Sequence, residues 1–339
     1  ATSSVDNIRT LENYGADKTI YDYDQVLSRC NKYGVEFDKI RPIFTLSENM
    51  SFALLNRLLD ALFNIDYSAY IGVIITHGTD TLAYTANLIS MMFSHKGIPF
   101  VLVSSNHPLS DVRANGVANF EAALDFICTA GFQGAYVIYR DYSGITEVHL
   151  ASRVKQMNQI VDAYESFKNI YFGTMVNGRF YRNDDLRNPN VSSIIAAKDI
   201  KGVKKLHLTK TVMMIYPYVG LRHDMYNIGP GLDAVVYGVY HSGTFFSHNE
   251  YPDNSINRLV EKLNEFNIPM YISEVSSLGD KYASAAALES NDAVNIVYDT
   301  SIENLYTKVT IAFDMFDNIK DRNNYIKNEN VFFEKVINM

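Results

Sequence analysis

Two threonines and an aspartate stand close together in GVIITHGTDTLAYTANLISMM, residues 72–92. The apolar residues before the turn predict a buried strand, and those after Asp80 predict a helix. Gly78 in that turn places Thr79 and Asp80 at the carboxyl end of the strand, where open parallel sheets bind their ligands. The helix start adds free N–H groups and a positive dipole end. These residues could serve only as helix caps, but capping alone does not explain why Thr81 follows them.

Two further strand ends carry small polar groups. In IFTLSENMS, residues 43–51, an apolar run ends at Ser47 and Glu48 before a helix. In PFVLVSSNHPLSDVRANGVANFEAAL, residues 99–124, a strand runs into Ser105 and a proline turn. Each could again be a cap, but carboxyl ends of parallel strands share one edge of a sheet. The convergence of three such ends predicts a ligand site better than any one of them.

The rest of the chain must supply the sheet that positions these ends. Short apolar runs predict seven buried strands, at 71–76, 100–104, 135–139, 212–216, 234–240, 269–273 and 294–298. Helical patterns lie at 51–64, 80–95, 114–128, 254–267, 302–316 and 320–337. This alternation predicts an α/β protein with parallel sheets covered on both faces.

Some details of this organisation can also be predicted. A turn in residues 136–153 predicts an antiparallel pair at a sheet edge. Asp253 or Asn254 is expected to cap the fourth helix, and Thr300 or Ser301 the fifth. The polar segment from 176 to 211 predicts a domain boundary near 205.

Composition excludes several classes of protein. The 339 residues are 47% hydrophobic and 20% charged with a net charge of −8, which is typical of a soluble globular protein and argues against a large nucleic-acid surface. The chain shows neither a transmembrane run nor a signal peptide. Its two cysteines, Cys30 and Cys128, favour a reduced, cytoplasmic protein. The histidines lack metal-ligand spacing, and no G-x-G-x-x-G follows a strand, so we expect no metal, no cofactor and no Rossmann dehydrogenase.

The quoted motifs resemble one known family, the bacterial-type L-asparaginases of the asparaginase/glutaminase family. THGTDTLAYTA is similar to that family's second signature, LSENMS to its substrate loop, and 99–124 to the segment after the signature. GLDAVVYGVYHSGTF, residues 231–245, and SNDAVNIVYDTSIENLYTKV, residues 290–309, resemble its smaller C-terminal domain. The resemblance covers residues from about 40 to 312.

This resemblance implies a larger N-terminal parallel-sheet domain and a smaller C-terminal Rossmann-like α/β domain. We expect the catalytic domain over 1–190, a linker over 191–211 and the second domain over 212–339. The implied activity is conversion of L-asparagine to L-aspartate and ammonia through a Thr-linked acyl-enzyme, with L-glutamine as a substrate left open. The implied partners are the small-molecule substrate and copies of the chain, as a homodimer or homotetramer, without nucleic acid or membrane.

The resemblance also assigns site residues. Thr79 and Asp80 match the family's second threonine and its aspartate, and Lys155 in SRVKQMNQIVDAY matches its lysine. Asp80 would bind the substrate ammonium with Glu48 nearby, Ser47 would hold the α-carboxylate, and the N–H of Thr79 would hold the oxyanion. A hydroxyl is a weak nucleophile near pH 7, and a lysine in a desolvated cleft can lose its proton and act as a base.

Other positions match less closely. Ser105 is a further candidate for substrate binding, and His241 takes roughly the position of an asparagine that meets substrate in some members. Tyr14, Tyr21 and Tyr23 are alternative candidates for the loop tyrosine that covers the site in the family.

The family's first strand ends in Thr-Gly-Gly-Thr, which carries the principal nucleophile, and that motif is absent here. By spacing, Thr2 lies 77 residues before Thr79 and could take its place. By local pattern, residues 1–7 resemble the stretch after the motif. We favour the second interpretation and expect the polypeptide to extend upstream, because loss of a central strand leaves its neighbours' backbone groups unpaired. The alternatives are a non-catalytic asparaginase-like protein that binds a small amino acid and a tRNA-dependent amidotransferase subunit.

Overall fold

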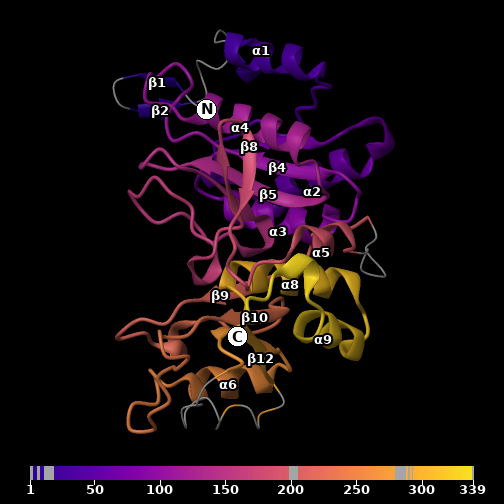
Figure 1. Cartoon of the computed structure of the whole chain (residues 1–339). Helices are drawn as coiled ribbons and strands as arrows, with labels where there is room; N and C mark the ends of the chain where they lie inside the picture. The colour runs from indigo at the N-terminus through magenta and orange to yellow at the C-terminus, as the bar shows by residue number, and fades with distance from the viewer. Residues whose placement is uncertain are drawn as a thin grey trace. The chain divides into compact units, whose positions relative to one another are not determined.

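The structure is a computed structural model that describes residues 3–5, 8–10, 19–197, 205–278, 288, 291 and 293–337. The described residues divide into two compact units (Figure 1). The first unit runs up to Lys205 and includes Val331–Phe333, and the second starts at Leu206 and holds the remaining C-terminal residues. Outside the two units' sheets, β1 (Ser3–Val5) and β2 (Ile8–Thr10) form an antiparallel pair.

The first unit is built on a six-stranded sheet in the order β3-β4-β5-β6-β7-β8. Its strands are β3 (Val73–Thr76), β4 (Pro99–Val103), β5 (Gly134–Arg140), β6 (Thr146–Leu150), β7 (Gly173–Val176) and β8 (Arg179–Arg182). β3, β4 and β5 are parallel, as predicted, and the next three are antiparallel. The predicted hairpin over 136–153 is confirmed as β5 and β6. Its predicted place at an edge is wrong, because β7 and β8 extend the sheet beyond it.

The hairpin of β7 and β8 is among the elements that were not predicted from the sequence. Asn177 and Gly178 form its turn, with φ of 50° and 74°. A two-residue turn with both φ values positive matches the right-handed twist of the strands, and Asn-Gly is its preferred sequence. The signal was therefore present in VNGRF, but these residues were interpreted as the start of the polar segment from 176 to 211 that holds the predicted domain boundary.

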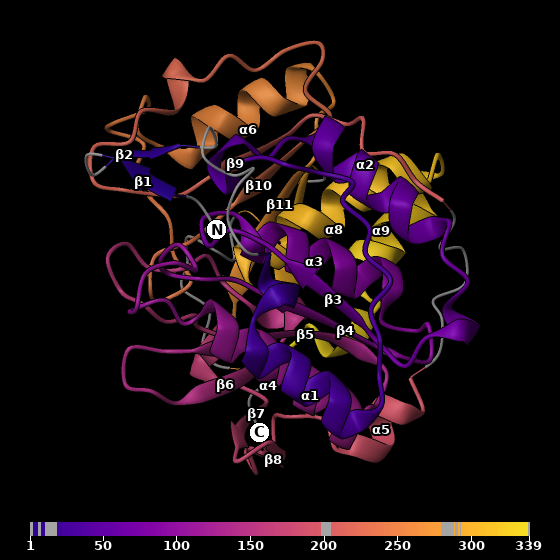
Figure 2. The ribbon, with the colours of Figure 1, turned by 90° about the horizontal axis from the view of Figure 1, so that it is seen from above.

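Helices cover the sheet of the first unit on both faces. They are α1 (Asp24–Tyr33), α2 (Phe52–Phe63), α3 (Leu82–Phe93), α4 (Gly116–Thr129) and α5 (Val191–Ile195). α1 was not predicted; it packs against α4 (Figure 2) and is capped by Gly34, whose φ of 64° suits a helix C-cap. α3 buries nearly every side chain, which explains why its sequence lacks a clear polar face.

β3 lies at the edge of this sheet. It pairs with β4 on one side, and no other strand among the described residues pairs with it. All five residues of β4 are buried, whereas Val73, Ile74 and Ile75 are half-buried and Thr76 is exposed. The strand that carries the candidate site at its carboxyl end therefore has one side open in the described structure.

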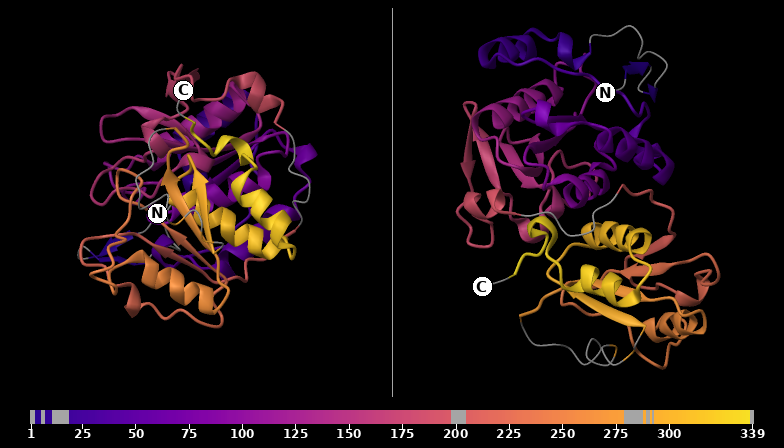
Figure 3. Two further views of the ribbon diagram at one scale, coloured as in Figure 1. Left: turned by 90° about the horizontal axis from the view of Figure 1, so that it is seen from below. Right: turned by 90° about the vertical axis from the view of Figure 1, so that its right-hand side faces the viewer.

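The second unit is a four-stranded parallel sheet in the order β12-β11-β10-β9, as expected for a Rossmann-like domain. Its strands are β9 (Val212–Ile215), β10 (Ala234–Tyr237), β11 (Met270–Val275) and β12 (Val294–Tyr298). Helix α6 (Ile256–Glu265) lies on one side of the sheet, and α8 (Ile302–Met315) and α9 (Ile319–Lys327) lie on the other (Figure 3).

Two predictions at the helix ends of this unit are wrong. Ser255, rather than Asp253 or Asn254, caps α6 by accepting a hydrogen bond from the N–H of Asn257. The last helix ends at Lys327 and does not reach residue 337. The prediction of Ser301 as the cap of α8 is confirmed.

Candidate active site

The first two polar motifs meet in the structure. Ser47 begins a short 3₁₀ turn and is buried, and its Oγ donates to Oδ2 of Asp80 at 2.7 Å. The N–H of Asp80 lies 3.3 Å from the same Oγ, and Oγ1 of Thr81 donates to the carbonyl of Ser47 at 2.8 Å. Residues that are 33 positions apart in the chain thus form one polar cluster, as predicted. The predicted strand end before Ser47 is wrong, because residues 43–46 form no strand and Ser47 is placed by the 3₁₀ turn. Asp80 itself is exposed and Thr79 is half-buried.

Gly78 is required at this junction by close packing. A Cβ added at Gly78 would meet Oγ of Ser47 and would lie 2.7 Å from its Cβ. The preceding His77 is fixed by the turn itself, since its Nδ1 pairs with the carbonyl of Gly78 at 2.8 Å and its Nε2 with Oγ1 of Thr85 at 3.0 Å. Burial lowers the pKa of His77, so the ring is neutral and acts as a hydrogen-bonding support.

The segment that carries Lys155 reaches the same edge through Tyr164. The hydroxyl of Tyr164 donates to the carbonyl of Thr79 at 3.1 Å and lies 3.4 Å from Oγ of Ser104 at the end of β4. Burial raises the pKa of Tyr164, which keeps its hydroxyl protonated as a donor. Tyr164 ends the motif SRVKQMNQIVDAY that carries Lys155, but this contact could not be predicted because it joins residues 85 positions apart.

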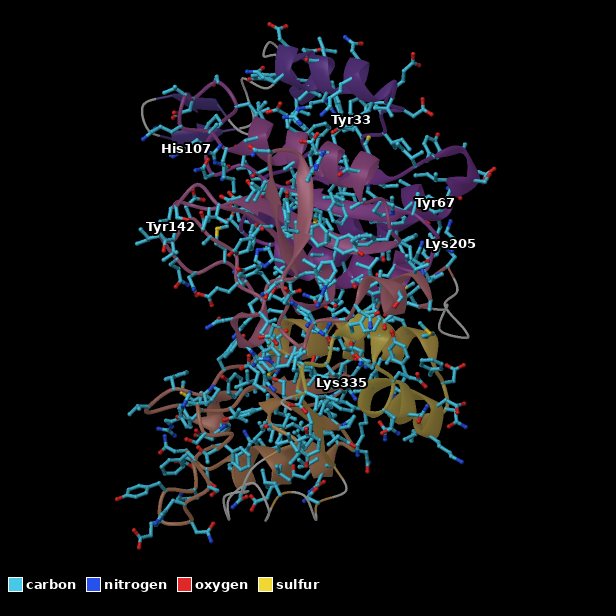
Figure 4. The ribbon with its side chains drawn as sticks, in the orientation of Figure 1. Tyr33, Tyr67, His107, Tyr142, Lys205 and Lys335 are labelled. Atoms are coloured by element: carbon cyan, nitrogen blue, oxygen red, sulfur yellow. The ribbon has the colours of Figure 1, made fainter. Side chains whose placement is uncertain are left out.

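Asp162 anchors the other side of this segment. Its carboxylate accepts hydrogen bonds from Nδ2 of Asn106 at 2.6 Å and from the hydroxyl of Tyr139, and its carbonyl accepts from the N–H of Tyr142. Figure 4 shows His107 and Tyr142, on the loops after β4 and β5, on the same side of the molecule. Loops from three places in the first unit are therefore joined at this edge.

Lys155 is half-buried, and its backbone is held by neighbours on both sides. Its N–H donates to the carbonyl of Glu165 at 2.9 Å, and the carbonyl of Val154 accepts from Nδ2 of Asn87 in α3 at 3.1 Å. Asn87 is fully buried and also donates to the carbonyl of Ala83 in its own helix at 2.8 Å. Because α3 begins directly after the threonine-aspartate turn, Asn87 ties the lysine segment to that turn.

The remaining candidates occupy different places. Glu48 is exposed in the turn that Ser47 begins, and Ser105 is half-buried with its Oγ donating to the carbonyl of His107 at 2.6 Å. His241 is exposed in a turn of the second unit. Thr2 lies outside the described residues.

The three tyrosine candidates also differ. Tyr21 packs its ring against Phe37 and Phe120. The hydroxyl of Tyr23 donates to the carbonyl of Leu109, on the loop that follows β4, at 3.0 Å. Tyr14 lies outside the described residues.

The described residues hold no group of three or more histidines, cysteines, aspartates or glutamates arranged to bind a metal ion. None of the helices in the described part of the chain is long and apolar enough to cross a membrane.

The fold and the site together define an α/β protein with a polar cluster at the carboxyl ends of parallel strands. Comparison with known proteins identifies its family. Residues 8–188, more than half of the chain, match the family model described as "Asparaginase, N-terminal", and the chain belongs to the asparaginase family.

Individual relatives agree with this family. The chain is 36% identical over 101 residues to an L-asparaginase of Thermococcus kodakarensis, which is 30% of this chain and 29% of the relative. It is 27% identical over 199 residues to a glutamyl-tRNA(Gln) amidotransferase subunit of Methanococcus maripaludis, which is 58% of this chain and 44% of the relative. The matches thus span less than half the length of either relative.

Solved structures support the same fold over nearly the whole chain. The thermostable L-asparaginase from Thermococcus kodakarensis matches with a TM-score of 0.68 and 21% identity, covering 93% of this chain and 92% of that one. The predicted α/β fold class is thereby confirmed.

Proposed function

We propose that this protein is an amidohydrolase that converts L-asparagine to L-aspartate and ammonia. One observation carries the proposal: hydrogen bonds join three separate parts of the chain at one edge of the sheet. Ser47 bonds to Asp80, and the segment that carries Lys155 bonds to the adjacent Thr79 through Tyr164. The proposal is further supported by membership of the asparaginase family.

The proposed reaction proceeds through an ester on a threonine. A threonine Oγ attacks the side-chain amide carbon of the substrate, the C–N bond breaks, and the nitrogen takes up a proton and leaves as ammonia. Water then hydrolyses the ester, which releases L-aspartate and restores the hydroxyl. Lys155 would take the proton from the attacking hydroxyl, and the N–H of Thr79 would bind the oxyanion of each tetrahedral intermediate.

The substrate's charged groups would be bound on the other side of the cluster. Asp80, whose carboxylate is exposed beside Ser47, would pair with the ammonium, and Glu48 would lie near it. Ser47 would donate to the α-carboxylate in exchange for its present bond to Asp80. Ser105 and His241 are further substrate-binding candidates.

The nucleophile is proposed to be a threonine on the family's first strand, with Thr2 as the candidate inside this chain. Removal of its hydroxyl by Thr2→Val tests that candidate directly. Loss of ammonia release with normal folding would assign the nucleophile to Thr2, and full activity would exclude it.

The first experiment is ammonia release from L-asparagine and L-glutamine by the wild type, Thr79→Val and Lys155→Met. We expect Lys155→Met to lose at least 100-fold in kcat, because it removes the proposed base and general acid–base catalysis typically contributes about 10²–10⁴-fold. Thr79→Val keeps the N–H that would bind the oxyanion and removes the hydroxyl that matches the family's second threonine, so we expect it to lower kcat through loss of that hydroxyl alone. Matched controls are Thr129→Val, whose hydroxyl donates to a carbonyl of its own helix, and the half-buried Lys96→Met. Wild-type-like activity in Thr79→Val or Lys155→Met would refute the proposed site.

A second function is favoured by one observation, the match to a glutamyl-tRNA(Gln) amidotransferase subunit. Such a protein would release ammonia from an amide and use it on a charged tRNA. The net charge of −8 argues against a broad tRNA surface. Ammonia release from L-glutamine that rises on addition of glutamyl-tRNA would support this alternative.

We also propose a cytoplasmic homodimer or homotetramer without a cofactor. The described cysteines, Cys30 and Cys128, are both free, as expected in a reducing compartment. The second unit exposes large apolar side chains, with Tyr218, Val219 and Met225 exposed to 60%, 97% and 78%. Burial of these side chains between copies of the chain would remove apolar surface from water, and light scattering coupled to size exclusion would give the mass in solution.

A further inference from the structure

A short segment near the C-terminus belongs to the first unit. Val331–Phe333 is part of that unit, although Asn330 before it and Glu334 after it belong to the second. Phe332 is 8% exposed, lies in the first unit's hydrophobic core and contacts the ring of Tyr136 edge to face, with the centroids 6.3 Å apart. The segment therefore completes a core that was formed by residues far earlier in the chain.

The backbone of this segment is unusual. Phe332 and Phe333 have φ values of 45° and 58°, which residues with a side chain rarely adopt. Such conformations persist only where the surrounding structure holds them, and they cluster at functional sites. Here they direct two successive carbonyl groups at one turn: the carbonyl of Phe332 accepts from Oγ of Ser152 at 2.8 Å, and that of Phe333 accepts from Nε of Arg153 at 2.6 Å.

The turn that receives these carbonyls is buried. Ser152 is fully buried and Arg153 is 2% exposed. The other guanidinium nitrogens of Arg153 donate to the carbonyl of Arg187 at 3.2 and 3.3 Å and to Oδ1 of Asn188 at 3.2 Å. Burial lowers the pKa of Arg153 to about 10, so it stays charged at neutral pH. Since the guanidinium is a rigid fork, these bonds fix both the position and the orientation of the turn.

Lys155 follows two residues after Arg153. Beyond the turn, the carbonyl of Val154 is held by Asn87, and the N–H of Lys155 is held by Glu165. The backbone at Lys155 thus has anchors on both sides, and the anchor before it consists of the buried turn and the carbonyls of Phe332 and Phe333.

We propose that Val331–Phe333 positions Lys155 for catalysis, with Ser152 and Arg153 as the positioning residues through which it acts. The inference rests on the proposed catalytic role of Lys155. A small displacement of a catalytic base lowers the rate sharply while leaving the groups that bind substrate in place. Displacement of the segment should therefore lower kcat and leave KM nearly unchanged.

The test uses two variants at one position of the full chain. Phe333→Pro imposes a φ near about −65° and so moves the carbonyl that Arg153 uses. Phe333→Gly keeps the positive φ at no steric cost and removes only a half-buried ring. Ser152→Ala is the second disrupting variant, because it deletes one bond to the segment without changing the backbone of residues 331–333.

Hydrogen exchange of the 151–158 peptide gives a readout that needs no activity. We expect at least tenfold faster exchange in Phe333→Pro and Ser152→Ala, wild-type exchange in Phe333→Gly, and unchanged exchange in helix α4. Unchanged exchange at 151–158 in folded Phe333→Pro and Ser152→Ala would overturn the proposed anchoring.

Kinetics of ammonia release supply the second readout. We expect both disrupting variants to lose at least tenfold in kcat, with KM within twofold of wild type. A rise in KM with normal kcat would overturn the positioning role, because the segment would then act on substrate binding. An inactive wild type would refute the proposed function and with it the catalytic part of this inference, while the exchange data would still decide whether the segment anchors the turn.

Discussion

Replacement of Gly78 by alanine tests the packing that joins the two site motifs. The new methyl group would meet Oγ of Ser47 and lie 2.7 Å from its Cβ, and real Cβ atoms essentially never approach other atoms under 3.0 Å. Ser47 must shift, although it is buried and bonded to Asp80. Overpacking of this kind costs about 1–3 kcal/mol, so we expect Gly78→Ala to lose that much free energy of unfolding. We also expect its KM for L-asparagine to rise, because Asp80 loses its support.

A double-mutant cycle separates this clash from other effects of the methyl group. In a Ser47→Gly background both clashing atoms are absent, so adding Gly78→Ala should cost less than about 0.5 kcal/mol. Gly229→Ala is the matched control, since its new Cβ would have its nearest neighbour, Cζ of Phe266, at 4.0 Å. Urea unfolding of the wild type, the three single variants and the double variant gives the free energies. An equal cost for Gly78→Ala in the wild-type and Ser47→Gly backgrounds would refute the reasoning.

Three further predictions concern buried polar groups. Burial lowers the pKa of His149 to about 4, so the unfolded chain takes up a proton below pH 6.5 that the native ring does not, and stability falls as the pH drops from 6.5 towards 4. The pKa of Glu147 is raised to about 7, so its titration changes stability in the opposite direction and must be removed by Glu147→Gln. In that background, urea unfolding should show the free energy of unfolding falling by about 2 kcal/mol between pH 7 and pH 5, and a further His149→Gln should abolish this loss. Lys308 and Glu334 form an ion pair in which both side chains are 1% exposed, so Glu334→Gln, which leaves the lysine charge unpaired, should lower the free energy of unfolding by about 3–5 kcal/mol. The Lys308→Met/Glu334→Leu double variant removes both charges, and an equally large loss in it would contradict this expectation. Ser255→Ala should lower the free energy of unfolding by about 1 kcal/mol, because α6 loses its N-cap. An unchanged midpoint of thermal unfolding would contradict this prediction.

Much of the fold followed from local pattern. Each of the seven predicted strand ranges has a counterpart in the structure, because a buried parallel strand reads as a short continuous apolar run. The shorter apolar run before Ser47 forms no strand. The failures have identifiable causes. The Asn177-Gly178 hairpin was hidden by polar neighbours. The last helix was predicted too long: it ends at Lys327, and Phe332 and Phe333 beyond it have positive φ values.

The candidate site was partly visible in the same way. The motifs around Ser47 and Asp80 were predicted to meet, and the structure joins them by a 2.7 Å hydrogen bond. The stated reason holds only for Asp80, which follows β3, because no strand precedes Ser47 at residues 43–46. The role of Tyr164 could not be predicted, since an isolated tyrosine in a polar segment carries no sign of its partner.

The sequence by itself determined the α/β class, the strand ends that carry hydroxyls and carboxylates, and the family that these motifs resemble. These properties are local, because they depend on periodicity and on turn residues a few positions apart. Only the tertiary structure decided how the Lys155 segment is held. Its anchors are Asn87, Glu165 and the carbonyls of Phe332 and Phe333, which are bonds between residues up to 180 positions apart. Such bonds depend on the packing of the whole unit, which no local pattern specifies.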